Sequence, residues 1–122
     1  MKEFKKLNIV ARRKKIFAFK KNAESFKLLC KILKTDPSPV IRHEAAFVLG
    51  NFKEKRVLPH LFHSIKKDKS DLVRHEAIEA LADVGIQTKS VQSLLKKLLK
   101  DKNPFIKDTA QMVWETLYPT LT

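Results

Sequence analysis

The chain has 122 residues and a formal net charge of +13, with 26 Lys and Arg against 13 Asp and Glu. This length supports one domain with its own core, and the single cysteine, Cys30, excludes an internal disulfide and favours a reducing, cytoplasmic setting. No long apolar run follows the basic N-terminus, so neither a secretory signal nor a membrane span is expected. Two glycines and five prolines in the whole chain favour helices throughout.

The N-terminal segment is the most basic part of the chain. Residues 1–21 hold nine Lys or Arg and one acid, Glu3, and residues 4–20 are predicted to form the first helix. Such charge attracts nucleic acid or an acidic protein. With 21 Lys and 5 Arg, however, it is also typical of a solvated lysine-rich surface. Both interpretations stay open.

Three later segments align with one another without gaps, at offsets of 32 and 33 residues. Each begins with a residue whose side-chain oxygen can accept a free backbone N–H at a helix start, namely Ser38, Ser70 or Asn103. A second amphipathic helix precedes each segment. We therefore predict an all-α fold, a short right-handed α-solenoid of about three full helix pairs plus flanking helices. It forms one domain over residues 1–122, with repeats over about 24–52, 56–84 and 90–117.

The tetrapeptide Arg-His-Glu-Ala occurs in the same register in the first two of these segments, at residues 42–45 and 74–77. At about 100° per residue, the apolar positions of each helix form one stripe and the His-Glu pair points away from it. The pairs are therefore predicted to face solvent. The third segment has Lys107-Asp108-Thr109 instead, so retention of the pair in two repeats suggests use beyond common ancestry.

The His-Glu pairs also predict a metal site. Equivalent helices of neighbouring repeats lie about 8–10 Å apart, so His43 and His75 are expected side by side on one ridge. Two imidazoles can span that gap to one ion, and a carboxylate completes a two-His, one-carboxylate set that suits iron(II) with open positions. A solvated, metal-free pair is the alternative.

The residues around these pairs resemble deoxyhypusine hydroxylase, a family built of HEAT-like, bilin-lyase-type repeats. The double His-Glu register in Val40–Gly50 and Leu72–Leu81 carries the resemblance. Residues 11–19, 22–30 and 103–109 extend it over nearly the whole chain. That family uses a di-iron centre to hydroxylate a lysine-derived residue on a translation factor. The resemblance implies that His43, His75 and Glu76 are iron ligands and that Glu44 contacts the substrate.

The resemblance covers one half of that family's site, which needs four His-Glu motifs. A homodimer would restore four motifs, because a two-fold interface presents the same patch twice. The resemblance then implies an iron- and oxygen-dependent hydroxylase, although whether the chain is an enzyme stays open. The alternatives are a metal-free adaptor for a protein partner and, ranked last, a nucleic-acid-binding module without exposed aromatic residues to stack on bases. No membrane partner is expected.

The remaining candidate residues have structural explanations. Arg42 and Arg74 are expected to bind the turn aspartate of a neighbouring repeat, Asp36 or Asp68. The remaining expectations concern exposure: His60 and His63 at the surface because they lack a third ligand, and Cys30 and Trp114 in the core because they fall on apolar stripes.

Overall fold

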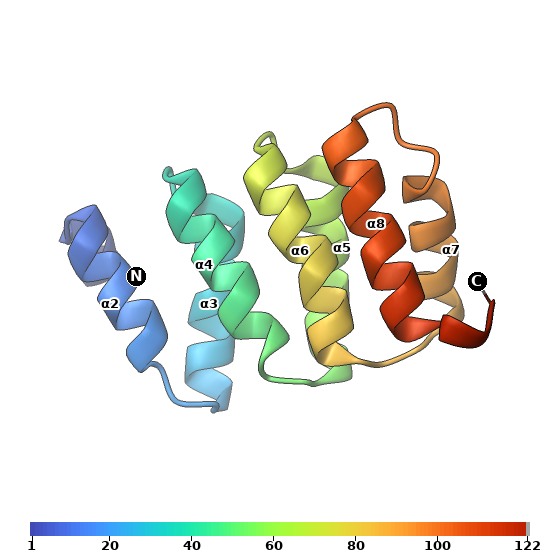
Figure 1. The fold of residues 1–122 in the computed structure, drawn as a ribbon. Helices are drawn as coiled ribbons and strands as arrows, with labels where there is room; N and C mark the ends of the chain where they lie inside the picture. Colours follow the sequence, from blue (N-terminus) through green and yellow to red (C-terminus); the bar gives the residue numbers. More distant parts are fainter. Residues whose placement is uncertain (122) are drawn as a thin grey trace.

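The computed structural model describes residues 1–121 as a stack of helices in two layers (Figure 1). The front layer consists of α2 (Ile9–Ala18), α4 (Pro39–Gly50), α6 (Asp71–Val84) and α8 (Pro104–Leu117). The back layer consists of α3 (Ala23–Thr35), α5 (Leu58–Lys67) and α7 (Lys89–Leu98). The short elements are α1 (Lys2–Lys6), η1 (Lys55–Val57) and η2 (Pro119–Leu121). The predicted all-α solenoid of three helix pairs with flanking helices is confirmed.

The front helices begin at the predicted capping residues. Ser38 accepts a hydrogen bond from the backbone N–H of Ile41, and Ser70 accepts the equivalent bond in the next repeat. Asn103 caps α8 in the same way. Pro39 and Pro104 follow at the first helical position, where the missing N–H costs nothing. These local signals therefore fix where each front helix starts.

The prediction of one helix over residues 4–20 is wrong, because two helices occupy this segment. The chain leaves α1 in an extended conformation at Leu7, and α2 begins at Ile9. The Oδ1 atom of Asn8 accepts the N–H of Ala11 at 2.9 Å. Asn8 thus occupies the same capping position as Ser38. The interruption between α1 and α2 follows from this helix start, which lies between basic residues and was not recognised in the sequence.

The core lies between the two layers and depends on one close helix approach. Ile41, Ala45 and Leu49 of α4 are fully buried, as are their equivalents in α6. At Gly50, the last residue of α4, an added Cβ would lie 2.9 Å from the Cβ of Ala80. The reason for glycine there is contact with α6, since only this residue leaves room for the two backbones to approach.

One arginine from each of α2, α4 and α6 binds the aspartate in the turn of the next repeat. Arg42 makes two hydrogen bonds to Asp68, at 2.9 and 3.1 Å, and a third to the backbone carbonyl of Asp36. The predicted Arg42 contact is thereby confirmed, whereas Arg74 binds Asp101 at 3.4 Å. The equivalent pair in the first repeat, Arg12–Asp36 at 3.2 Å, was missed by sequence reasoning. These pairs join every repeat to its neighbour at one edge of the solenoid.

The other candidate residues lie where expected. His60 and His63 are exposed, with His60 edge-on to the ring of Phe26. Cys30 is half-buried against the core, and burial raises the pKa of its thiol to about 11, which disfavours a nucleophilic role. Trp114 is buried. Within residues 1–121, no helix has the length and hydrophobicity needed to cross a membrane.

Candidate functional site

The front helices start in a common register, so equivalent residues form rows across the layer. We call the row that contains the two histidines the His row and the adjacent row the Glu row. The His row is Arg13, His43, His75 and Asp108. The Glu row is Lys14, Glu44, Glu76 and Thr109.

The His-row residues of α2, α4 and α6 each contact the Glu-row residue of the following front helix. The Nε2 atom of His43 lies 3.0 Å from Oε1 of Glu76, across the α4–α6 gap. Arg13 reaches Glu44 in the same way at 3.6 Å, and the Nδ1 atom of His75 lies 2.7 Å from Oγ1 of Thr109. Residues from different repeats are therefore paired, which a single helical wheel does not reveal.

These contacts correct the prediction that the His-Glu pairs face solvent. The side chains of His43 and Glu76 are 24% and 10% exposed, and that of Glu44 is 12% exposed. The histidines do point away from the apolar stripe of their own helix. The flanks of that helix, however, are covered by the helices on either side of it, and the pairs are covered with them.

Glu76 is the most buried charged residue of this site. Burial, followed by the nearby carboxylates of Glu79, Asp83 and Glu44, raises its pKa to about 7. Four carboxyl groups thus share one region of a chain whose net charge is +13. Their mutual repulsion is the kind that a bound cation relieves.

A hydrogen-bond chain fixes the tautomer of His75. The hydroxyl of Thr109 donates to the carbonyl of Phe105 at 2.8 Å, so its oxygen must accept from the Nδ1–H of His75. The Nε2 atom lies 3.3 Å from Oε1 of Glu79, four residues later on the same helix. The ring also stacks on Phe105, with centroids 4.5 Å apart. This arrangement orients His75 as second partners orient metal-ligating histidines.

The structure brings together two of the three predicted metal ligands. Two donor atoms at neighbouring positions around one ion, each about 2.1 Å from it, are about 3.0 Å apart. His43 Nε2 and Glu76 Oε1 have this spacing. The imidazole of His75 turns toward α8 instead, and among residues 1–121 no three His, Cys, Asp or Glu side chains form a metal-binding group. Glu44, the predicted substrate contact, lies 3.4 Å from Nδ1 of His43. Of the three predicted ligands, His43 and Glu76 are thus close enough to share one ion, and His75 is not part of this arrangement.

Exposed apolar residues flank the His row on both sides. One apolar row, three positions before the His row, consists of Val10, Val40, Leu72 and Phe105, which are 40–60% exposed. The other, four positions after it, contains Phe17, Phe47 and Met112, with Glu79 in the remaining place. These two apolar rows include all but one of the large exposed hydrophobic residues among those described. Sequence reasoning missed them, although their spacing repeats with the His-Glu pairs.

A shallow groove of about 300 Å³ adjoins the site between α4, α6 and α8. Three carboxylates line it together with apolar side chains from the second apolar row. Its lining residues are Phe47, Glu76, Glu79, Ala82, Asp83, Met112 and Val113. Acidic groups beside exposed apolar surface suit a cationic ligand with an aliphatic part.

The sequence matches the family of HEAT repeats over residues 26–114, which is most of the chain. The chain belongs to the HEAT-repeat family. Two curated relatives of this HEAT-repeat chain are deoxyhypusine hydroxylases. The one from Eremothecium gossypii is 38% identical over 76 residues, and the one from Aspergillus oryzae is 39% identical over 87 residues. These alignments cover 62% and 70% of this chain and 23% and 25% of the relatives.

A solved structure extends the likeness to nearly the whole HEAT-repeat chain. The structure of human deoxyhypusine hydroxylase in complex with glycerol matches with a TM-score of 0.84 and 25% identity, over 96% of this chain and 41% of that one. The predicted relationship to deoxyhypusine hydroxylase is confirmed. The chain spans about a quarter of the length of the curated relatives it matches.

Proposed function

We propose that the front layer binds a divalent metal ion, iron by its relationship to deoxyhypusine hydroxylase, through His43, Glu76 and His75. The observation that carries the proposal is the 3.0 Å separation of His43 Nε2 and Glu76 Oε1 across two helices. The raised pKa of Glu76 supports it, because crowded carboxylates gain from a cation. Bound ferrous iron would supply a centre that activates oxygen for hydroxylation.

The surrounding residues orient the ligands in this proposal. Thr109 accepts a hydrogen bond from Nδ1–H of His75, and in the proposal Nε2 turns from Glu79 to bind the ion. Glu44 lies beside Nδ1 of His43 and also pairs with Arg13. The resemblance implies that Glu44 contacts a substrate, and the proposal keeps this role for it.

We further propose that two copies of the chain face each other through their front layers. Exposed apolar rows beside a polar centre are typical of an interaction surface. The charge along this layer is self-complementary under a two-fold axis. Helix α2 carries four basic residues and no acid, whereas α6 and α8 together carry six acids and two bases. An antiparallel pairing sets the basic end of one copy against the acidic end of the other and brings four His-Glu motifs together.

The test is the metal content of untagged protein by elemental analysis, with light scattering to measure its mass. We expect about one iron per chain and twice the chain mass of 14.1 kDa. His43→Ala and Glu76→Ala should remove the metal, while the double variant His60→Ala/His63→Ala should keep it, because those histidines lie in the back layer. Protein that takes up no metal from excess ferrous iron without oxygen would contradict the proposal.

The second candidate function is a metal-free adaptor that binds a protein through the same two apolar rows. The observation that favours it is the exposure of Val40, Phe47 and Met112. These apolar side chains can contact a protein partner whether or not a metal is bound. An adaptor predicts that His43→Ala leaves partner binding unchanged and that Phe47→Asp abolishes it. The metal-site proposal predicts that His43→Ala removes the metal from a chain that remains folded.

A further inference from the structure

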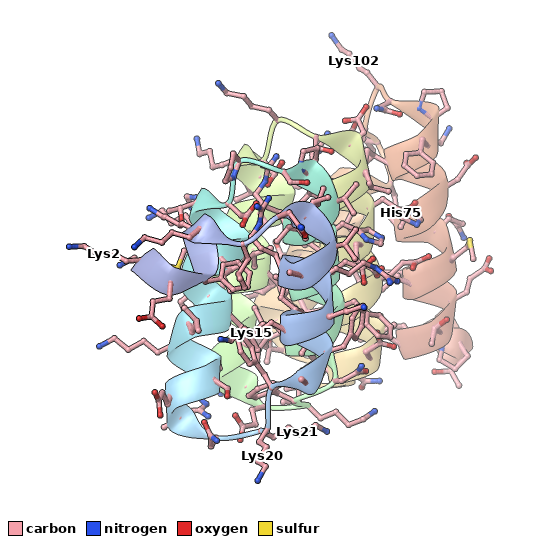
Figure 2. All side chains as sticks on the ribbon, turned by 90° about the vertical axis from the view of Figure 1, so that its left-hand side faces the viewer. Lys2, Lys15, Lys20, Lys21, His75 and Lys102 are labelled. Atoms are coloured by element: carbon pink, nitrogen blue, oxygen red, sulfur yellow. The ribbon has the colours of Figure 1, made fainter. Side chains whose placement is uncertain are left out.

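The back layer has a surface quite different from that of the front layer. Of the sixteen exposed residues on α3, α5 and α7, eight are lysines and one is acidic, Glu24. Of the thirteen exposed residues on α4, α6 and α8, one is a lysine, Lys107, and three are acidic. The back-layer lysines are Lys27, Lys31, Lys34, Lys66, Lys67, Lys89, Lys96 and Lys97. Figure 2 shows Lys2 of α1 and His75 on opposite sides of the molecule.

A general preference for lysine does not explain this distribution. Such a preference would place lysines on the exposed positions of both layers at similar frequency. The two layers belong to the same repeats and alternate along the chain, so they share one composition. Exposed lysines of the front layer lie mainly on α2, at Lys14 and Lys15, so within α3 to α8 their concentration on the back helices indicates a role for that face.

The neighbouring acids do not neutralise the lysine face. Asp36, Asp68 and Asp101 at its edge are engaged by the arginines of the front layer. Glu54, before α5, pairs with Arg56 at 2.7 Å. The lysines of α3, α5 and α7 thus remain as uncompensated positive charge.

A groove of about 430 Å³ between α5 and α7 concentrates this charge. Its lining contains three lysines and two serines but no acid among the residues described. The lining residues are Phe62, Lys66, Lys89, Ser90, Ser93, Leu94 and Lys97. Lys89 and Ser90 belong to the first turn of α7, where backbone N–H groups and the helix dipole also favour an anion. Ammonium groups, hydroxyls and free N–H groups together suit a phosphate.

We propose that the back layer is a docking surface for the phosphate backbone of a nucleic acid, centred on the α5–α7 groove. Lysine gives point charges that contact phosphates without reading base edges, so the binding is independent of sequence. An anionic membrane surface fits less well, since amphipathic elements that bind membranes insert apolar residues. None of the large exposed hydrophobic residues among those described lies on α3, α5 or α7.

The experiment is fluorescence anisotropy of a labelled 20-nucleotide RNA titrated with the full chain at 50 to 200 mM salt. We expect affinity to fall at least tenfold over this range, because each phosphate contact releases a counterion. The triple variant Lys66→Glu/Lys89→Glu/Lys97→Glu should weaken binding at least tenfold. The control, Lys14→Glu/Lys15→Glu/Lys107→Glu, changes the net charge equally on α2 and α8 and should weaken it less than threefold.

Several results would overturn this proposal. Equal loss in the two triple variants would show that only net charge matters. No RNA binding at 50 mM salt, or binding to phosphatidylserine vesicles in preference to RNA, would also contradict it. Circular dichroism checks that both variants keep their helices, and the corresponding alanine variants replace any that do not. The metal content of the back-layer variant Lys66→Glu/Lys89→Glu/Lys97→Glu is expected to match the wild type, because all three lysines lie on α5 and α7, so this test is separate from that of the front layer.

Discussion

The front and back layers of this solenoid are built from the same repeats, yet their exposed surfaces have diverged completely. In both layers the buried positions are occupied by similar aliphatic residues, because each helix must pack against its neighbours on the same stripe. The exposed positions of α4, α6 and α8 hold mainly apolar and acidic residues around two half-buried histidines, with the basic residues of the front layer on α2, whereas half of the exposed positions of the back layer are lysines. Packing thus constrains the buried residues of each repeat, whereas the exposed residues of each layer can change and acquire a separate function.

The largest expected effect on stability concerns the contact that joins the layers and the repeats. Arg42→Ala removes the bidentate partner of the buried Asp68 carboxylate and the hydrogen bond to the carbonyl of Asp36. We therefore expect the free energy of unfolding to fall by about 3 kcal/mol. Arg56→Ala is the control, because its pair with Glu54 is nearly half exposed and should contribute less than about 1 kcal/mol. Urea denaturation of both variants measures the difference. Similar losses would mean that the joint between repeats is no stronger than a surface ion pair.

The second prediction concerns the pH dependence of stability, which we expect to come from Glu76 in the front layer and not from the back layer. The pKa of Glu76 in the folded chain, about 7, exceeds its ordinary value of 4.5, so the folded state holds a proton that the unfolded state releases. Stability from this group is therefore fully present below pH 4.5 and is lost as pH rises to 7, by about 3 kcal/mol in metal-free protein. Glu76→Gln should remove this loss, while Glu24→Gln in the back layer should leave it. An unaltered pH profile in Glu76→Gln would contradict the assignment.

The smallest of the three effects tests how the front layer orients its second histidine. Thr109→Val keeps the shape of the side chain but removes the oxygen that accepts from His75, so we expect metal affinity to fall about 10- to 100-fold. Thr116→Val is matched to it, because Thr116 makes the same hydroxyl bond to the carbonyl four residues earlier and faces solvent. Titration of the metal-free protein with ferrous iron gives both affinities. Equal affinities in these variants would show that Thr109 does not position the imidazole.

The sequence predicts the repeats of this fold well, because the capping residues and apolar stripes are local signals that each helix carries itself. It fails at Asn8, where the same capping signal lies within a run of basic residues. At the site it identifies the His-Glu pairs but assigns their surroundings incorrectly. His43 on α4 contacts Glu76 on α6, and His75 on α6 contacts Thr109 on α8. A helical wheel shows one helix at a time, so it reveals neither contact. The lysine face was hidden for a similar reason, since net charge does not reveal which helices share a layer.

The arginine–aspartate contacts have a mechanical consequence for the solenoid. The connections from α3 to α4, α5 to α6 and α7 to α8 lie along one edge of the stack, and those from α2 to α3, α4 to α5 and α6 to α7 lie along the opposite edge (Figure 1). Every arginine–aspartate contact lies at the first edge, so the spacing of the repeats is held there. At the opposite edge, single hydrogen bonds from Lys53 to the carbonyl of Asp83 and from Gln87 to the carbonyl of Leu117 join the repeats, so bending is expected to widen that edge more easily. A force that pulls the repeats apart is therefore expected to separate the helices first at the edge that lacks the arginine–aspartate contacts.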